Sequence, residues 1–71
     1  MRVPDPDLVD VNRATLIQLL RLPGIDGTLA GRIIAVRERV GRFSSLDELG
    51  AALALDRVVV EGLRDWVEFG P

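Results

Sequence analysis

The chain repeats itself at a separation of 30 residues, and this repeat limits the possible folds more than any other feature. Each copy begins with threonine or serine followed three residues later by glutamine or glutamate, at Thr15–Gln18 and Ser45–Glu48. That spacing is typical of a capping box, which opens a helix. The match continues through the pairs Leu16 and Leu46, Leu19 and Leu49, Ile25 and Leu55, Asp26 and Asp56, and Ile33 and Leu63. We therefore expect two similar helical units that bury their apolar faces against each other.

The stretch Leu22-Pro23-Gly24-Ile25-Asp26 separates the two helices expected in the first unit. Pro23 ends the first helix, because proline lacks an amide hydrogen and disfavours helical geometry in the residue before it. Gly24 permits a tight turn, and Ile25 points into the bend. Asp26 then caps a second helix, predicted over about Gly27 to Val40. The apolar stripe expected on the first helix consists of Leu16, Leu19, Leu20 and Leu22.

The second unit is predicted to contain a helix ending near Leu53 and another over about Arg57 to Phe69. We place Trp66 in the core, because it continues a helical stripe with Val59, Leu63 and Val67. That periodicity outweighs the strand propensity of the three consecutive valines before it. Phe43, an apolar residue in a polar linker, is expected to fill the core between the units. Asn12 is expected to bond backbone in the turn before the first helix.

Composition limits the function classes. The 71 residues suffice for one domain, and the absence of cysteine and histidine excludes a Cys/His zinc site, thiol chemistry and a histidine base. The net charge of −2 argues against a strong nucleic-acid binder, although all nine basic residues are arginine and a local basic face remains possible. We expect a cytoplasmic protein if the chain is complete. A domain cut from a longer anchored or secreted protein fits the sequence equally well.

These patterns predict an all-α fold, a tandem helix-hairpin-helix in a compact SAM-like domain of four to five helices with a pseudo-twofold repeat. We expect residues 1–10, with two prolines and three aspartates, to form an irregular lead. The tandem domain would cover residues 11–71, in units of about 11–40 and 41–69. No apolar run reaches the length of a membrane span, so we expect no membrane contact by this segment.

Four blocks of the chain resemble the ComEA-type helix-hairpin-helix domain, the DNA receptor of bacterial competence. They are Val11-Asn12-x-Ala14-Thr15, Leu22-Pro23-Gly24-Ile25, Leu29-Ala30-x-x-Ile33-Ile34-x-x-Arg37 and Gly41-x-Phe43-x-Ser45-x-x-Glu48-Leu49. The resemblance covers about Val11 to Val67. It implies the tandem helical fold and sequence-independent DNA binding through the first hairpin. Related folds also mediate protein contacts, so the fold alone does not assign the function.

The first hairpin is the candidate phosphate site, because backbone amides at a helix N-terminus bind anions. The candidate residues are Gly24, Ile25, Asp26, Gly27 and Thr28, flanked by Arg21 and Arg32, with Arg13, Arg37, Arg39 and Arg42 as extensions. The chain departs from the DNA-binding pattern in two places. Asp26 stands where the family often has a second glycine, and Gly27-Thr28-Leu29 lacks the usual cation. A carboxylate at Asp26 is expected to compete with phosphate.

Protein interaction and catalysis are the two other function classes. The second hairpin, Ala51-Ala52-Leu53-Ala54-Leu55, lacks the proline and glycine of the first and is apolar, so it is expected to be buried or to face a partner. A protein-protein interaction module with a degenerate phosphate site is therefore the alternative, with Leu53, Leu55 and Val58 as its surface. Catalysis is not expected, because the sequence contains no nucleophile–base constellation. No cofactor, metal or small-molecule substrate is expected.

Overall fold

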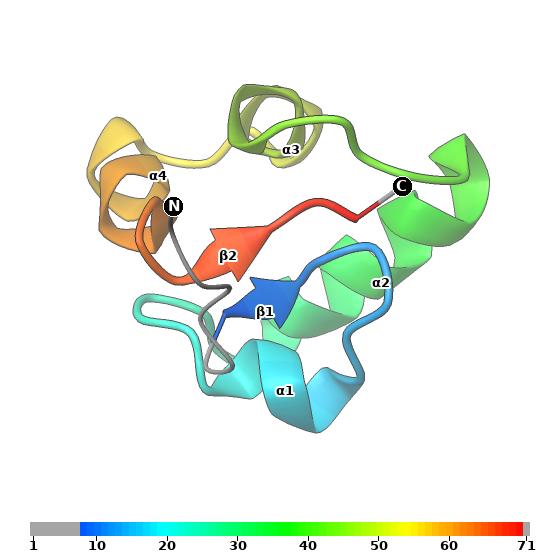
Figure 1. Ribbon diagram of the computed structural model, residues 1–71, viewed down its shortest axis with the longest axis horizontal. Helices are drawn as coiled ribbons and strands as arrows, with labels where there is room; N and C mark the ends of the chain where they lie inside the picture. Colours follow the sequence, from blue (N-terminus) through cyan, green and yellow to red (C-terminus); the bar gives the residue numbers. More distant parts are fainter. Residues whose placement is uncertain (1–7, 71) are drawn as a thin grey trace, which may run out of the picture.

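The computed structural model describes residues 8–70, which form four helices around two short strands (Figure 1). The helices are α1 (Leu16–Leu20), α2 (Gly27–Val40), α3 (Leu46–Leu53) and α4 (Arg57–Leu63), and the strands are β1 (Val9–Asp10) and β2 (Val67–Glu68). In Figure 1, α1 and α2 lie below and to the right of the strands, and α3 and α4 lie above and to the left. The domain is thus mostly helical and has the predicted pseudo-twofold repeat.

The first unit follows the predicted pattern of caps. The Thr15 hydroxyl accepts from the Gln18 amide at 3.2 Å, and the Gln18 side chain accepts from the Thr15 amide at 2.9 Å. This capping box opens α1, which lasts only five residues. The Asp26 carboxylate accepts from the Leu29 amide at 2.8 Å and caps α2, whose bounds are those predicted.

The second unit repeats the backbone of the first as well as its sequence. Ser45 caps α3 by accepting from the Glu48 amide at 3.1 Å, and Asp56 caps α4 by accepting from the Val58 amide at 3.1 Å. Gly24 in the first hairpin and Ala54 in the second both have positive φ, 77° and 53°. Left-handed geometry costs a residue with a Cβ about 1–2 kcal/mol. The second hairpin therefore keeps the turn of the first without its glycine.

The prediction of a fourth helix reaching Phe69 is wrong, because α4 ends at Leu63 and a turn leads into β2. The strand β2 pairs in parallel with β1: the Val9 amide donates to the Trp66 carbonyl at 2.9 Å, and the Val11 amide to the Glu68 carbonyl at 3.0 Å. The lead predicted to be irregular is therefore a strand at Val9 and Asp10. Residues 1–7 of that lead lie outside the described part of the chain.

The core lies between the two units, where α2 packs on α3. Phe43 is fully buried there, which confirms its predicted role, and Leu19, Leu49 and Leu63 are also buried. Trp66 is 49% exposed, so its predicted core position is wrong: the turn after α4 carries it off the helical stripe. Within residues 8–70, no helix is long and apolar enough to cross a membrane.

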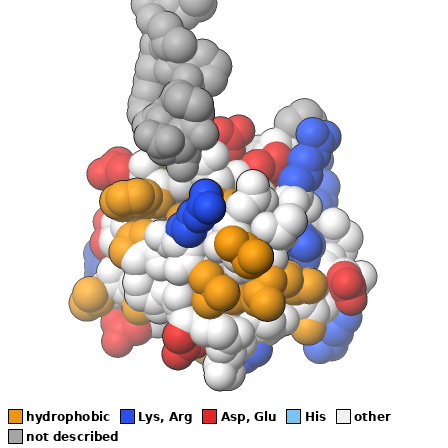
Figure 2. Space-filling model, turned by 90° about the horizontal axis from the view of Figure 1, so that it is seen from below, with side chains coloured by type: hydrophobic (Ala, Val, Ile, Leu, Met, Phe, Trp, Pro, Cys, Tyr) orange, Lys and Arg blue, Asp and Glu red, His pale blue; other side chains and the backbone are white. Residues whose placement is uncertain are grey.

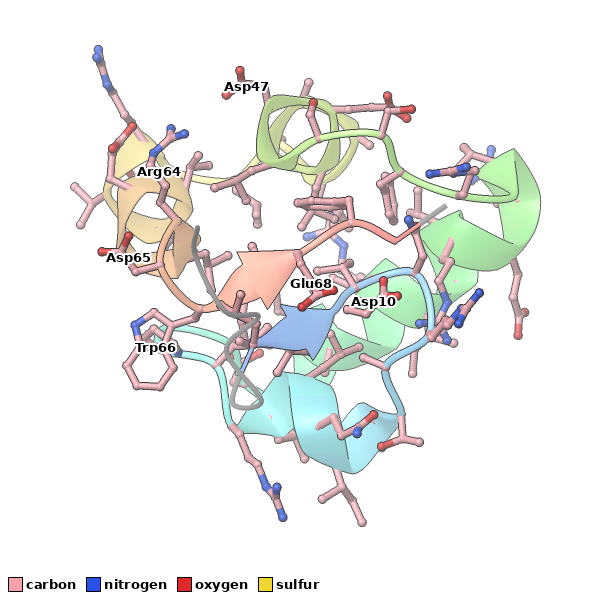
Figure 3. The ribbon with its side chains drawn as sticks, in the orientation of Figure 1. Asp10, Asp47, Arg64, Asp65, Trp66 and Glu68 are labelled. Carbon is pink, nitrogen blue, oxygen red and sulfur yellow. The ribbon has the colours of Figure 1, made fainter. Side chains whose placement is uncertain are left out.

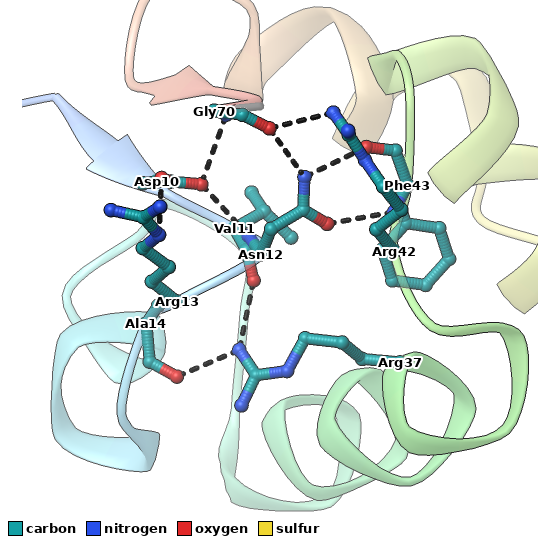
Figure 4. A network of polar contacts seen from close by, with 9 residues as sticks. All are labelled: Asp10, Val11, Asn12, Arg13, Ala14, Arg37, Arg42, Phe43 and Gly70. Atoms are coloured by element: carbon teal, nitrogen blue, oxygen red, sulfur yellow. Dashed lines mark hydrogen bonds and ion pairs between the residues drawn. The ribbon is translucent and has the colours of Figure 1, made fainter.

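Asn12 joins three segments that are distant in sequence (Figure 4). Its side-chain amide donates to the carbonyls of Phe43 at 2.8 Å and Gly70 at 3.3 Å, and its oxygen accepts from the Phe43 amide at 2.7 Å. The Asp10 carboxylate accepts from the amides of Asn12 at 3.0 Å and Gly70 at 3.2 Å. Asn12 does bond backbone, but in the linker and near the end of the chain rather than in its own turn.

Candidate functional site

Two buried apolar side chains hold the first hairpin against the core. Ile25 is 6% exposed, and its amide donates to the Leu22 carbonyl at 3.3 Å, so this residue plugs the bend as predicted. Leu22 is also buried, and its amide donates to the Leu19 carbonyl at 3.1 Å. Pro23 and Gly24 remain exposed between these two anchors. The hairpin therefore presents its backbone outward from a fixed base.

Four of the backbone amides predicted as donors are unused within residues 8–70. They belong to Gly24, Asp26, Gly27 and Thr28, all of which are exposed. The next two amides are occupied: that of Leu29 donates to the Asp26 carboxylate at 2.8 Å, and that of Ala30 to the Asp26 carbonyl at 2.8 Å. The hairpin and the first turn of α2 thus offer adjacent donors to an external acceptor.

Asp26 places a negative charge beside these donors. Its carboxylate bonds the Leu29 amide and leaves the amides of Gly27 and Thr28 without an acceptor among the described residues. A helix N-terminus favours one nearby anion by about 0.3–1 kcal/mol. The Asp26 carboxylate already takes that position, so a phosphate bound next to it must overcome like-charge repulsion.

Three of the six arginines considered for phosphate contacts donate to backbone carbonyls instead. Arg32 Nη2 lies 3.3 Å from the Leu53 carbonyl oxygen at the end of α3 and so connects the two units. Arg37 Nη1 donates to the carbonyls of Val11 at 2.9 Å and Ala14 at 2.8 Å (Figure 4), and the residue is half-buried. Arg42 Nη2 donates to the Gly70 carbonyl at 2.7 Å.

Arg21 is the arginine next to the hairpin whose side chain is not engaged. It follows α1 directly, is exposed, and its guanidinium has no hydrogen bond or ion pair within the described region. Arg39, at the far end of α2, is exposed and equally unengaged there. Arg13 Nε lies 4.0 Å from the Asp10 carboxylate. Arg21 is therefore best placed to add positive charge to the free amides.

The second ion pair of the described residues joins Glu61 of α4 to Arg64, the residue that follows α4. Arg64 donates to the Glu61 carboxylate through Nη2 at 3.1 Å and Nε at 3.4 Å. This hydrogen-bonded pairing lowers the pKa of the Glu61 carboxyl and raises the pKa of the Arg64 guanidinium. Both side chains are more than half exposed, so the pair is a surface contact with little effect on stability.

Most of the apolar residues predicted to be exposed on the second hairpin are not exposed. Leu53 in the second hairpin is 1% exposed and Leu55 is half-buried, although Val58 is 78% exposed. Instead α1 leaves three large side chains in solvent: Leu16 at 44%, Ile17 at 66% and Leu20 at 42% exposure. Figure 2, which views the molecule from the α1 side, shows hydrophobic side chains gathered on this face.

Sequence reasoning missed the structural role of Arg37 and, although it predicted backbone hydrogen bonds for Asn12, placed their partners in the wrong segment. A signal for both was present. Each is a polar residue within the blocks that carry the family resemblance, yet neither lies in the hairpin. A polar residue inside these blocks but outside the hairpin is a candidate for hydrogen bonds that hold the fold together.

Comparison with known proteins supports the same motif. A family model described as the helix-hairpin-helix motif matches residues 6–68, which is most of the chain. Motifs of this kind are generally nucleic-acid binding. No curated protein and no solved structure gives a significant match.

Proposed function

Because the chain belongs to the helix-hairpin-helix family, we propose that it is a DNA-binding module that contacts phosphates through its first hairpin. The observation that carries this proposal is the group of unused backbone amides at the exposed residues Gly24, Asp26, Gly27 and Thr28. Arg21 lies directly before the hairpin and supplies a cation. Backbone amides and a guanidinium are the donors that phosphate oxygens accept from.

This mode of binding does not read base sequence. The donors are backbone amides, which reach phosphate oxygens but carry no side chain to distinguish base edges. The module is therefore expected to bind duplexes of different sequence equally. It acts in this proposal by binding alone, without catalysis or cofactor.

The affinity is expected to be low. One hairpin that neutralises two or three phosphates corresponds to a dissociation constant of about 10⁻⁴ M or weaker at physiological salt. The Asp26 carboxylate weakens it further. Useful binding then requires several copies or a tether, which raise the effective concentration. The resemblance to ComEA-type receptors suggests DNA uptake in competence as a setting.

A titration of the ¹⁵N-labelled protein with a short blunt duplex at two salt concentrations tests the proposal. We expect amide shifts clustered on Gly24 to Thr28 that shrink as salt rises, with a slope of log K against log salt of about −2 to −3. Arg21→Glu should abolish the shifts. Arg39→Glu is the control, because it reverses another exposed, unengaged arginine, at the end of α2 that is farther from the hairpin. Absence of shifts at low salt would exclude DNA binding by this surface.

A second candidate function is protein contact through the exposed α1 residues Leu16, Ile17 and Leu20. These residues form an apolar face on a chain whose net charge is −2, a combination more common in protein interfaces than in DNA-binding surfaces. The same titration separates the two functions. If DNA leaves the hairpin amides unshifted, protein contact becomes the favoured function.

A further inference from the structure

A cleft of about 540 Å³ opens between β1, α1 and the turn that follows α4. Its lining includes Val9, Leu22 and Trp66 as apolar walls and Arg13, Gln18 and Arg21 as polar groups. Leu22 begins the first hairpin and Arg21 precedes it, so the cleft adjoins the proposed phosphate site. The cleft shares Arg21 with that site, but none of the four free hairpin amides belongs to a residue that lines it.

Trp66 forms a fixed aromatic wall of this cleft. Its side chain is 49% exposed, whereas Phe43 is fully buried and Phe69 is half-buried. The backbone on both sides of the ring is held: the Trp66 amide donates to the Leu63 carbonyl at 2.9 Å, and the Trp66 carbonyl accepts from the Val9 amide at 2.9 Å. Figure 3 shows the ring projecting at the edge of the molecule. The indole Nε1 has no acceptor among residues 8–70.

The polar groups of the cleft carry a local positive balance. The Arg21 side chain has no partner in the described region. The Arg13 side chain is 75% exposed, and its Nε comes no closer than 4.0 Å to the Asp10 carboxylate. Asp10 also lines the cleft, but its carboxylate accepts from the amides of Asn12 and Gly70. The lining of the cleft thus contains two guanidinium groups and one carboxylate, whose Oδ1 already accepts from two backbone amides.

We infer that this cleft binds an unpaired nucleotide, with its base stacked on Trp66 and its phosphate on Arg21. An aromatic ring next to a free cation matches the flat face and the charge of a nucleotide, and every base offers such a face. A wholly apolar peptide would leave the charge of Arg21 desolvated without a partner among the described residues. The inference deepens the proposed function and rests on it, because the hairpin would hold the neighbouring phosphates.

The consequence is a preference for DNA with a single-stranded end. The bases of a blunt duplex are stacked on one another, so the duplex reaches only the hairpin and Arg21. A strand with an unpaired end adds the contact with Trp66. Base–aromatic stacking corresponds to about a tenfold or larger change in affinity for each base.

The experiment compares a ten-nucleotide oligothymidylate with a blunt duplex, both fluorescein-labelled, by anisotropy at low salt. The variants Trp66→Ala, Trp66→Leu and Trp66→Phe separate aromatic stacking from bulk. We expect Trp66→Ala and Trp66→Leu to weaken oligothymidylate binding about tenfold while blunt-duplex binding stays the same. Trp66→Phe should retain most of the affinity. Val58→Ala, which trims another exposed apolar side chain, is the control for nonspecific effects.

Each other outcome overturns the inference in a recognisable way. If Trp66→Ala leaves both ligands unaffected while the duplex still binds through the hairpin, the inference fails and the proposed function stands. If Trp66→Leu binds oligothymidylate as well as the unmodified protein, the cleft is an apolar contact and not a stacking site. If all variants lose both ligands equally, the residue is merely structural. If neither ligand binds the unmodified protein, the inference and the proposed function fall together.

Discussion

Asn12 and Phe43 bond each other through both backbone groups of Phe43, with the Asn12 side chain donating at 2.8 Å to the carbonyl and accepting at 2.7 Å from the amide. The two bonds resemble those that facing residues of a β-ladder exchange. They hold the linker against the start of the first unit while the Phe43 ring is fully buried between the units. A single polar side chain therefore fixes the position of the largest fully buried core residue.

Replacing Asn12 should destabilise the domain without changing its surface charge. Asn12→Ala removes the bonds to Phe43 and Gly70 and leaves their backbone groups unpaired, which we expect to cost about 2–3 kcal/mol. Urea unfolding followed by Trp66 fluorescence measures the loss. Ser44→Ala is the control, because Ser44 is exposed beside Phe43 and its hydroxyl makes no hydrogen bond within residues 8–70. A loss below about 0.5 kcal/mol would contradict the structural role of Asn12.

The two hairpins predict opposite effects of exchanging glycine and alanine. Gly24→Ala places a Cβ on a residue with φ 77° and should destabilise the domain by about 1 kcal/mol. Ala54→Gly removes the Cβ from a residue with φ 53° and should stabilise the domain by up to about 1 kcal/mol. Gly31→Ala serves as the control within α2, where an added Cβ meets nothing within 4 Å. That change should stabilise by about 0.5–1 kcal/mol. Equal signs at Gly24 and Ala54 would mean that the hairpins are not conformational equivalents.

Asp26→Asn should strengthen DNA binding while the helix remains capped. Asparagine caps a helix about as well as aspartate, so the bond to the Leu29 amide is retained and only the charge disappears. Removing 0.3–1 kcal/mol of competition corresponds to an affinity about two- to fivefold higher, measurable by the same NMR titration. Asp26→Ala loses both cap and charge and should cost about 1 kcal/mol of stability. Weaker binding by a folded Asp26→Asn variant would show that the carboxylate assists the site.

A close approach of α3 to α4 predicts a coupled pair of substitutions. A Cβ added at Gly50 would lie 2.9 Å from Val60 Cγ2, so Gly50→Ala forces a shift and should destabilise by about 1–3 kcal/mol. Val60→Ala makes room for the added Cβ but itself lowers the stability of the domain, because it removes apolar contacts. The double variant should be more stable than the sum of the two losses, by about 0.5–2 kcal/mol. Additive losses in thermal unfolding would indicate that the two residues do not compete for this space.

The parts of the fold that local sequence determines were predictable. The bounds of α2 follow from Asp26 at its start, Gly41 at its end and apolar spacing between them, all within 16 residues. Asp56, which the repeat pairs with Asp26, caps α4. Amides at the first hairpin were equally predictable, because an N-cap and a helix start leave the next amides unpaired.

The parts of the fold that depend on contacts between distant segments could not be predicted from the sequence. Helical periodicity continues from Val59 through Val67, and nothing nearby signals that the chain leaves the helix after Leu63. The signal is β1, which pairs with β2 from the other end of the chain. The exposure of Trp66 and the backbone bonds of Arg37 have the same origin. Each depends on a segment more than 20 residues away, which a local pattern does not contain.

The pairing of Val9 with Val67 also bears on how the domain folds. It closes a loop of nearly the whole described chain, and the entropy lost on closure grows as (3/2)RT ln n, about 3.6 kcal/mol for a loop near 60 residues before a constant contribution. The hydrogen bonds of so short a strand pair do not offset this loss unless the two units already bring the strands together. The strand pair is therefore expected to form late, after the helical units dock. It then ties the start of the first unit to the end of the second.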